Sequence, residues 1–332
     1  MINNIKTFGK FLDQPLLISK LNKAMPMILL GGASVSAGKN AYDVFVKNKT
    51  DNKEELKENK IKFHKNTAIL FASCIGALCA PKIASKIIKR DLIPSVSDVV
   101  KNNCNLIDDF ISKNDLDEQT LEILNKAKSK VLSFSEIKSL INNLKVNLKS
   151  DFIDKLIPDP QNVSSKDIFS EIGYLSLYGA IPVVSGVASG IVVDKFGADT
   201  KAKTSTCDKI SEGLYQYLAN IFLCNVGAGC ALGILEKLGI DNKALRAASM
   251  VTGIILTGVV GGNKIANLIS QKIVSPICRT EIKERKPEIV DLGMHTDDIA
   301  TVATLSGLKW IEPCLPFLYA LSGFKSGIGY RN

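Results

Sequence analysis

The stretch IGYLSLYGAIPVVSGVASGIVV, residues 172–193, decides the class of this protein. Its 22 residues carry no charge, and Glu171 and Asp194 stand at its two ends. About 20 apolar residues in a helix are enough to cross the hydrocarbon core of a bilayer. A second uncharged stretch, GLYQYLANIFLCNVGAGCALGIL at 213–235, contains 23 residues and meets the same requirement. Both stretches predict membrane-spanning helices.

Three shorter uncharged stretches predict further spans. They contain 17, 16 and 15 residues, at 247–263, 66–81 and 24–38 respectively. Helices of that length reach across a bilayer when flanking lysines extend toward the headgroups. We therefore expect an all-α protein, a helical membrane bundle of five or six spans with a small soluble helical insert. Buried helices of a large soluble α-rich protein are the alternative.

Glycines spaced four apart recur in the apolar stretches. Such a pair gives a helix one smooth face on which a second backbone can approach closely, and in lipid this approach is a main source of helix association. In a water-soluble helix each glycine costs about 1 kcal/mol relative to alanine. We expect helix packing at four pairs: Gly186 and Gly190, Gly229 and Gly233, Gly258 and Gly262, and Gly323 and Gly327.

The first 90 residues divide into two expected parts. Residues 1–23 mix isoleucine and phenylalanine with lysine and predict an amphipathic N-terminal segment that lies at a surface. Residues 24–90 predict a two-span membrane hairpin with a polar loop at 39–65. The stretch 24–38 also resembles a secretory signal with a small-residue cleavage site. Its long apolar leader favours an uncleaved first span.

Residues 91–168 are polar and contain no long apolar stretch. Ser133 and Glu136 have the spacing of a capping box, in which each side chain bonds the other residue's backbone N–H at a helix start. The segment therefore predicts a soluble helical insert, which we expect to bind a protein partner or to mediate self-association. Residues 169–332 predict a second membrane block of three to four helices.

Two glycine-rich stretches only partly match nucleotide-binding motifs. In residues 27–40, Ala33 occupies the first glycine position of a phosphate-binding loop, and Asn40 replaces the hydroxyl that would bind magnesium. In residues 226–233, Leu232 stands at the third glycine of a dinucleotide-binding turn. A nucleotide-binding protein is therefore a minor alternative, and we expect no cofactor.

The remaining composition argues against several kinds of binding and catalytic site. The net charge is +9, but the basic residues lie scattered at the ends of apolar stretches without aromatic residues to stack bases, so we expect no nucleic acid. The eight cysteines include no CxxC pair, and they do not suggest a disulfide framework. With only His64 and His295 as histidines, we expect no metal site. No serine or cysteine has a recognisable catalytic base.

The segment Lys309-Trp-Ile-Glu312-Pro-Cys-Leu-Pro316 interrupts an apolar stretch with charge. Lys309 and Glu312 can pair on a helix, and the prolines prevent a regular helix from continuing. Charges beside a broken helix form substrate sites in transporters. The alternative is a helix that ends at Glu312, followed by a turn at the headgroup level.

These features indicate only the general class of the protein's function. We expect an integral membrane protein, anchored in the lipid bilayer, with a structural or interaction role, and not an enzyme. A transporter or channel that uses Lys309 and Glu312 is the alternative. Lysines and arginines flank both ends of the expected spans almost equally, so the positive-inside rule assigns no orientation.

Overall fold

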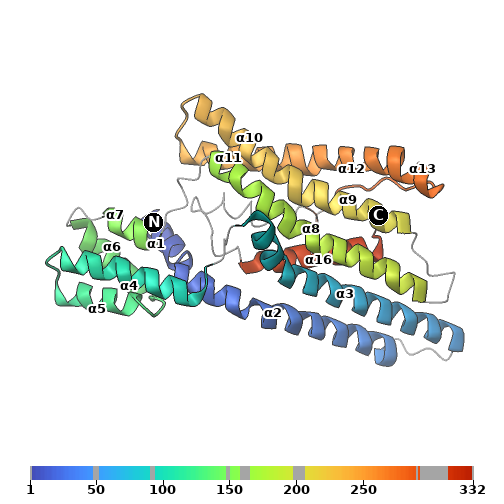
Figure 1. Ribbon diagram of the computed structural model, residues 1–332, viewed down its shortest axis with the longest axis horizontal. Coiled ribbons are helices and arrows are strands. Elements are labelled where there is room, and N and C mark those ends of the chain that lie inside the picture. The colour runs from blue at the N-terminus through green and yellow to red at the C-terminus, as the bar shows by residue number, and fades with distance from the viewer. Residues whose placement is uncertain are drawn as a thin grey trace. The chain divides into compact units, whose positions relative to one another are not determined.

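A computed structural model describes residues 2–47, 52–89, 94–146, 150–157, 165–196, 206–288, 291 and 313–330. Every regular element within these residues is helical, and none of them is a strand. The chain divides into two compact units (Figure 1). The first contains Met1–Met25, Asp91–Val163 and Asp297–Cys314, and the second contains Pro26–Arg90, Ser164–Thr296 and Leu315–Asn332. The all-α class is therefore confirmed.

The first unit has its own hydrophobic core. Its helices are α1 (Ile2–Leu12), the start of α2 (Pro15–Tyr42), α4 (Val96–Ser112), α5 (Glu118–Ala127), α6 (Phe134–Val146) and α7 (Ser150–Leu156). The buried residues include Ile107, Leu124, Ile137, Leu140 and Leu144, all 0% exposed. They recur at helical spacing, so each helix turns one apolar face inward.

Side chains at the helix starts define where these helices begin. Ser133 and Glu136 form the expected capping box: the Ser133 N–H donates to Glu136 Oε2 at 2.7 Å, and the Glu136 N–H donates to Ser133 Oγ at 3.3 Å. The contact with the Lys126 ammonium, followed by the capping contacts with Ser133, lowers the pKa of Glu136 to about 2. The capping prediction is confirmed.

The N-terminal segment packs inside this unit. The rings of Phe11 and Phe134 meet edge to face at 6.4 Å, and Lys10 pairs with Asp154 at 2.7 Å. The expected boundary between residues 23 and 24 falls inside α2, which continues through Pro26 to Tyr42. Phe11 on α1 therefore packs against protein, whereas Phe8 is 51% exposed.

The second unit contains the long apolar helices. They are the remainder of α2, a π-helical turn η1 (Asp43–Lys47), α3 (Lys53–Ile88), α8 (Ser165–Phe196), α9 (Thr206–Tyr217), η3 (Leu218–Phe222), α10 (Leu223–Lys237), α11 (Lys243–Gly253), η4 (Ile254–Gly262), α12 (Asn263–Ile269), η5 (Ser270–Val274), α13 (Ser275–Cys278) and α16 (Leu315–Ile328). The η elements are π-helical. Figure 1 shows α3, α8 and the continuous helix from α9 to α10 side by side.

Four helices of the described residues are long and apolar enough to cross a membrane. They are Lys53–Ile88, Ile172–Lys195, Thr206–Lys237 and Ala248–Cys278. The helix α16 has 14 residues, and a helix of that length rises only about 21 Å, less than the roughly 30 Å hydrocarbon core. The polar loop expected at 39–65 is helical over most of its described length, because α2 and η1 reach Lys47 and α3 begins at Lys53.

Candidate functional site

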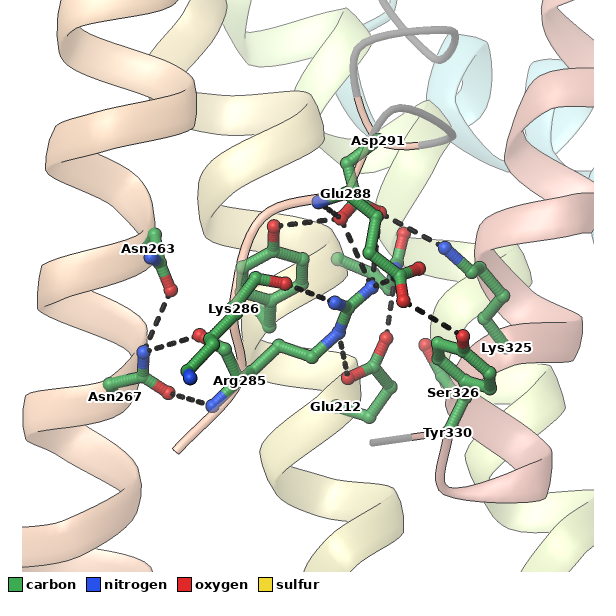
Figure 2. Close-up of polar contacts among 12 residues, drawn as sticks. Glu212, Asn263, Asn267, Arg285, Lys286, Glu288, Asp291, Lys325, Ser326 and Tyr330 are labelled. Atoms are coloured by element: carbon green, nitrogen blue, oxygen red, sulfur yellow. Dashed lines mark hydrogen bonds and ion pairs between the residues drawn. The ribbon is translucent and has the colours of Figure 1, made fainter. Parts of the chain in front are cut away.

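A cluster of buried charges lies between α9, α16 and the chain that follows α13. Arg285 is 0% exposed, and its Nε lies 3.3 Å from Oε2 of Glu212 on α9. Its Nη2 lies 3.0 Å from Oδ2 of Asp291, and Lys325 on α16 donates from Nζ to Asp291 Oδ1 at 3.0 Å (Figure 2). Two cations and two carboxylates thus neutralise one another inside the bundle. Residues Glu212, Arg285, Asp291 and Lys325 are called the charge network below.

Arg285 reaches this position because an extended segment, residues 281–288, packs along α12. The Asn267 side chain binds the backbone of Arg285 on both sides: its Nδ2 donates to the carbonyl oxygen at 2.8 Å, and its Oδ1 accepts from the N–H at 3.0 Å. Asn263 Oδ1 accepts from the same Nδ2 at 2.7 Å (Figure 2). Non-helical backbone at membrane depth is tolerated only when protein satisfies its polar groups. Asn267 pairs with both backbone polar groups of Arg285.

Two tyrosines surround the guanidinium. The Tyr215 hydroxyl donates to Asp291 Oδ2 at 3.1 Å, and the Tyr330 hydroxyl donates to Glu288 Oε1 at 2.9 Å. The carbon atom Cζ of Arg285 lies 4.7 Å from the centre of the Tyr215 ring and 5.2 Å from that of Tyr330. A cation close to an aromatic ring is attracted by the ring's electron density, so both rings help to hold the buried charge.

A chain of side-chain amides continues from Glu212 along α9 and η3. Gln216 donates from Nε2 to Glu212 Oε1 at 2.7 Å, and Asn220 donates from Nδ2 to Gln216 Oε1 at 2.9 Å. Glu212 and Gln216 are 0% exposed and Asn220 is 6% exposed. The Asn220 Oδ1 atom is buried without a hydrogen-bond partner. The chain therefore ends on an unsatisfied acceptor within a π-helical turn, a local geometry often found at functional sites.

A second charged group joins three long helices of the same unit. Asp194 near the end of α8 binds both Lys65 on α3 and Lys209 on α9. Lys65 and Asp194 adjoin uncharged stretches, and Lys209 lies four residues before one, so the group marks one end of the apolar part of the bundle.

Two of the predicted glycine pairs meet each other. A Cβ atom built on Gly186 would overlap the carbonyl oxygen of Gly323, and one on Gly190 would overlap that of Gly327. The backbones of α8 and α16 therefore touch where only glycine fits. This observation supports a packing role, which stays a proposal for a lipid environment.

The other glycines differ in their surroundings. A Cβ on Gly258 would lie 2.8 Å from the Cys224 Cβ, and one on Gly262 would lie 2.6 Å from the Ala219 Cα. A Cβ on Gly229 would lie 3.0 Å from the Phe169 ring. At Gly233 the nearest atom, the Ser165 Cβ, lies at 3.6 Å, an ordinary contact that a side chain tolerates.

The structure describes the two glycine-rich stretches that partly match nucleotide-binding motifs, but not the predicted charged site. Lys309 and Glu312 lie outside the described residues. The stretches 27–40 and 226–233 lie inside the helices α2 and α10, so neither forms the loop that would hold a phosphate. Within the described part of the chain, no group of three or more histidine, cysteine or acidic side chains could hold a metal ion.

One pair of cysteines is joined. Cys207 in the first turn of α9 and Cys278 at the end of α13 form a disulfide, with their Cα atoms 6.3 Å apart. The cysteine pattern predicts no disulfide framework, and it gives no sign of this bridge because 71 positions separate the two residues. Only the antiparallel return of the chain brings them together.

Comparisons with known proteins give no relative. No protein-family model, no curated protein and no solved structure matches this chain. Its function is therefore argued from its own geometry.

Proposed function

We propose that this chain is an integral membrane protein with a structural or interaction role. The observation that carries the proposal is the low burial of very apolar helices. The four helices that are long enough to span have windows of mean hydropathy between 1.2 and 1.9, yet those windows are only 17% to 50% buried. A water-soluble protein rarely exposes contiguous apolar surface of that extent. Lipid would cover it.

Individual side chains support this proposal. On α8, Val184 is 64% exposed, and on α13, Ile277 is 77% exposed. Large apolar residues are also exposed along η4, α12 and η5: Leu256, Val260, Ile265, Leu268 and Ile273. Polar and small residues point inward instead, as Ser322, Gly323 and Ser326 do on α16. Apolar surface outside and polar contacts inside are what hydrocarbon surroundings favour.

A structural role is supported by the pairing of the buried charges. A transported ion or substrate needs polar groups that can bind it, whereas the charge network satisfies its cations and carboxylates mainly with one another. Such pairing fixes α16 and the segment 281–288 against α9. The residues 91–168, with their separate core, are the proposed site for a protein partner or for self-association.

Extraction of membranes tests the proposal. Membranes that contain the full chain are washed with alkaline carbonate, which releases peripheral proteins, and then with detergent. We expect the protein to stay in the carbonate pellet and to enter solution only with detergent. Recovery of a monodisperse protein without detergent would refute the membrane assignment.

A transporter is the second candidate function. The charge network, and not the segment near Lys309, is the site that we propose for it. Ionisable residues within membrane helices commonly mark ion or proton pathways. The amide chain from Glu212 to Asn220 and the extended segment at Arg285 resemble parts of such pathways. Proteoliposomes loaded with a pH-sensitive dye provide the test: a proton flux that Glu212→Gln abolishes would favour transport over a structural role.

A further inference from the structure

The Cys207–Cys278 disulfide bears on which compartment each end of the second unit faces. Contacts between neighbouring helices show which helix ends lie on the same side as the disulfide. Lys65 on α3 contacts Asp194 on α8, and farther along the two helices a Cβ on Gly76 would lie 3.2 Å from the Pro182 Cα. The contacts therefore advance in opposite directions, and α3 and α8 are antiparallel.

The next two helices alternate in the same way. Lys209 at the start of α9 contacts Asp194 near the end of α8, whereas Glu236 at the end of α10 accepts from the Ser165 N–H at 2.9 Å at the start of α8. The helix from α9 to α10 is therefore antiparallel to α8.

The helix from α11 to α13 runs back along α10 and α9. A Cβ on Gly227 would overlap the carbonyl oxygen of Gly253, and one on Gly262 would lie 2.6 Å from the Ala219 Cα. The disulfide continues this antiparallel series at the far end. Asp194, Lys209 and Cys278 therefore lie near one end of the long helices that follow α3, called the disulfide end below, and Ser165 and Glu236 lie at the opposite end. Lys65, which precedes the apolar stretch of α3, faces the disulfide end.

We propose that the disulfide end faces an oxidising compartment and that the opposite end faces a reducing one. The inference rests on the proposed membrane function, because only a bilayer separates the two ends. Disulfides persist in the bacterial periplasm, in secretory compartments and outside cells, whereas cytosolic thiols are kept reduced. The bond fixes the orientation that the scattered lysines leave open.

The chemistry of the bond requires an oxidant on that side. The thiolate of one cysteine attacks an external disulfide and forms a mixed disulfide, and the second thiolate then displaces the external sulfur. The two cysteines together lose two protons and two electrons, and the external disulfide is reduced to two thiols. Protein or small-molecule disulfides of an oxidising compartment supply this reagent.

The test uses bacterial cells that carry the full chain in the cytoplasmic membrane. Their outer membrane is removed, and they are called intact cells below while the cytoplasmic membrane is unbroken. All thiols are first blocked with a permeant maleimide. A membrane-impermeant reductant and an impermeant maleimide polymer are then added, so that only a disulfide on the outer face is opened and tagged. We expect a mobility shift of two tags, and none for Cys207→Ser combined with Cys278→Ser.

Two exposed lysines at opposite ends provide matched controls. Lys195 is the last residue but one of α8, at the disulfide end, and Lys237 ends α10 at the other end. In a chain whose six cysteines outside the disulfide are alanine, Lys195→Cys should react with the impermeant polymer on intact cells. Lys237→Cys should react only after lysis.

Each other outcome overturns the inference. Two tags that appear only after lysis, with Lys237→Cys tagged on intact cells, would show the reverse orientation. No tag under either condition would show that the disulfide does not form. Carbonate washing of the same membranes separates these failures from the proposed function, because release of the protein would refute membrane insertion itself.

Discussion

At the scale of single residues, the charge network is costly to leave incomplete. Taking an ion out of water costs several kcal/mol, and a buried pair compensates only while both partners are present. Arg285 contacts Glu212 at 3.3 Å and Asp291 at 3.0 Å, and all three are 0% exposed. Removal of the Arg285 cation therefore takes the ion-pair partner from Glu212 and leaves Asp291 with Lys325.

We expect Arg285→Met to lower the unfolding free energy of the second unit by about 3–5 kcal/mol. Thermal unfolding in detergent measures this change. Addition of Glu212→Gln should restore part of the loss, because it neutralises the unpaired carboxylate while Asp291 keeps Lys325 as its partner. Lys272→Met changes an exposed lysine of η5 in the same unit and should have little effect. Equal effects of the two single changes would contradict the burial of the network.

A second residue-scale prediction concerns backbone contact. A Cβ on Gly186 meets the backbone of Gly323, which cannot move aside, whereas a Cβ on Gly32 of α2 meets nothing within 4 Å. Gly186→Ala should therefore cost about 1–3 kcal/mol or more by overpacking. Gly32→Ala should be neutral or add up to about 1 kcal/mol from helix propensity. If both changes have the same effect on detergent-solubilised stability, α8 and α16 do not touch there.

The sequence indicated little of the charge network. Glu212 and Lys325 were visible only as charges that border apolar stretches, and Arg285 lies among polar residues, where a solvated loop is the simplest expectation. Its burial depends on Asn267, 18 positions earlier, which binds its backbone. Such a pairing depends on how the chain turns after α13, and no local spacing encodes that turn.

At the scale of elements, helix α6 depends on its capping box and hence on pH. The pKa of Glu136 is lowered to about 2 in the folded protein from an ordinary value of 4.5, so the ionised carboxylate contributes stability above pH 4.5. That contribution should be lost as the pH falls from about 4.5 toward 2.

Hydrogen exchange at the backbone amides of α6 provides the measurement. Protection should decline across this pH range in the natural chain, and Glu136→Gln should show weaker protection at neutral pH with less dependence on acid. Glu122→Gln removes a carboxylate from α5, outside the capping box, and is the control. An unchanged pH profile in Glu136→Gln would show that the capping carboxylate is not the titrating group.

Element types were easier to predict than element ends. Uncharged stretches and the Ser133–Glu136 spacing indicate helices because both are local signals. The length of α3 was not predicted, since its first turns, from Lys53 onward, are rich in lysine and glutamate and look like a loop. Both residues favour helices when they are exposed, so the apolar stretch at 66–81 continues in both directions as one helix.

At the scale of the whole molecule, each unit has its own core and should unfold with its own transition. Leu140 is 0% exposed in the core of the first unit, so Leu140→Ala should cost that unit about 2–5 kcal/mol. Gly186→Ala should act on the second unit. Hydrogen exchange resolved by peptide can follow both units in one sample. If each substitution lowered protection equally in the two units, the chain would unfold as one cooperative block.

The disulfide also gives this chain a mechanical property. The bond closes a ring of chain, because 71 positions separate Cys207 from Cys278. When a single molecule is pulled by its two termini, the force passes through the bond and the ring stays unextended. At roughly 3.4 Å per residue, the stretched chain should be about 240 Å shorter than that of the reduced protein. Force spectroscopy without reductant should therefore show that the chain between Cys207 and Cys278 does not extend. With reductant, the same residues should extend, because the disulfide is then broken.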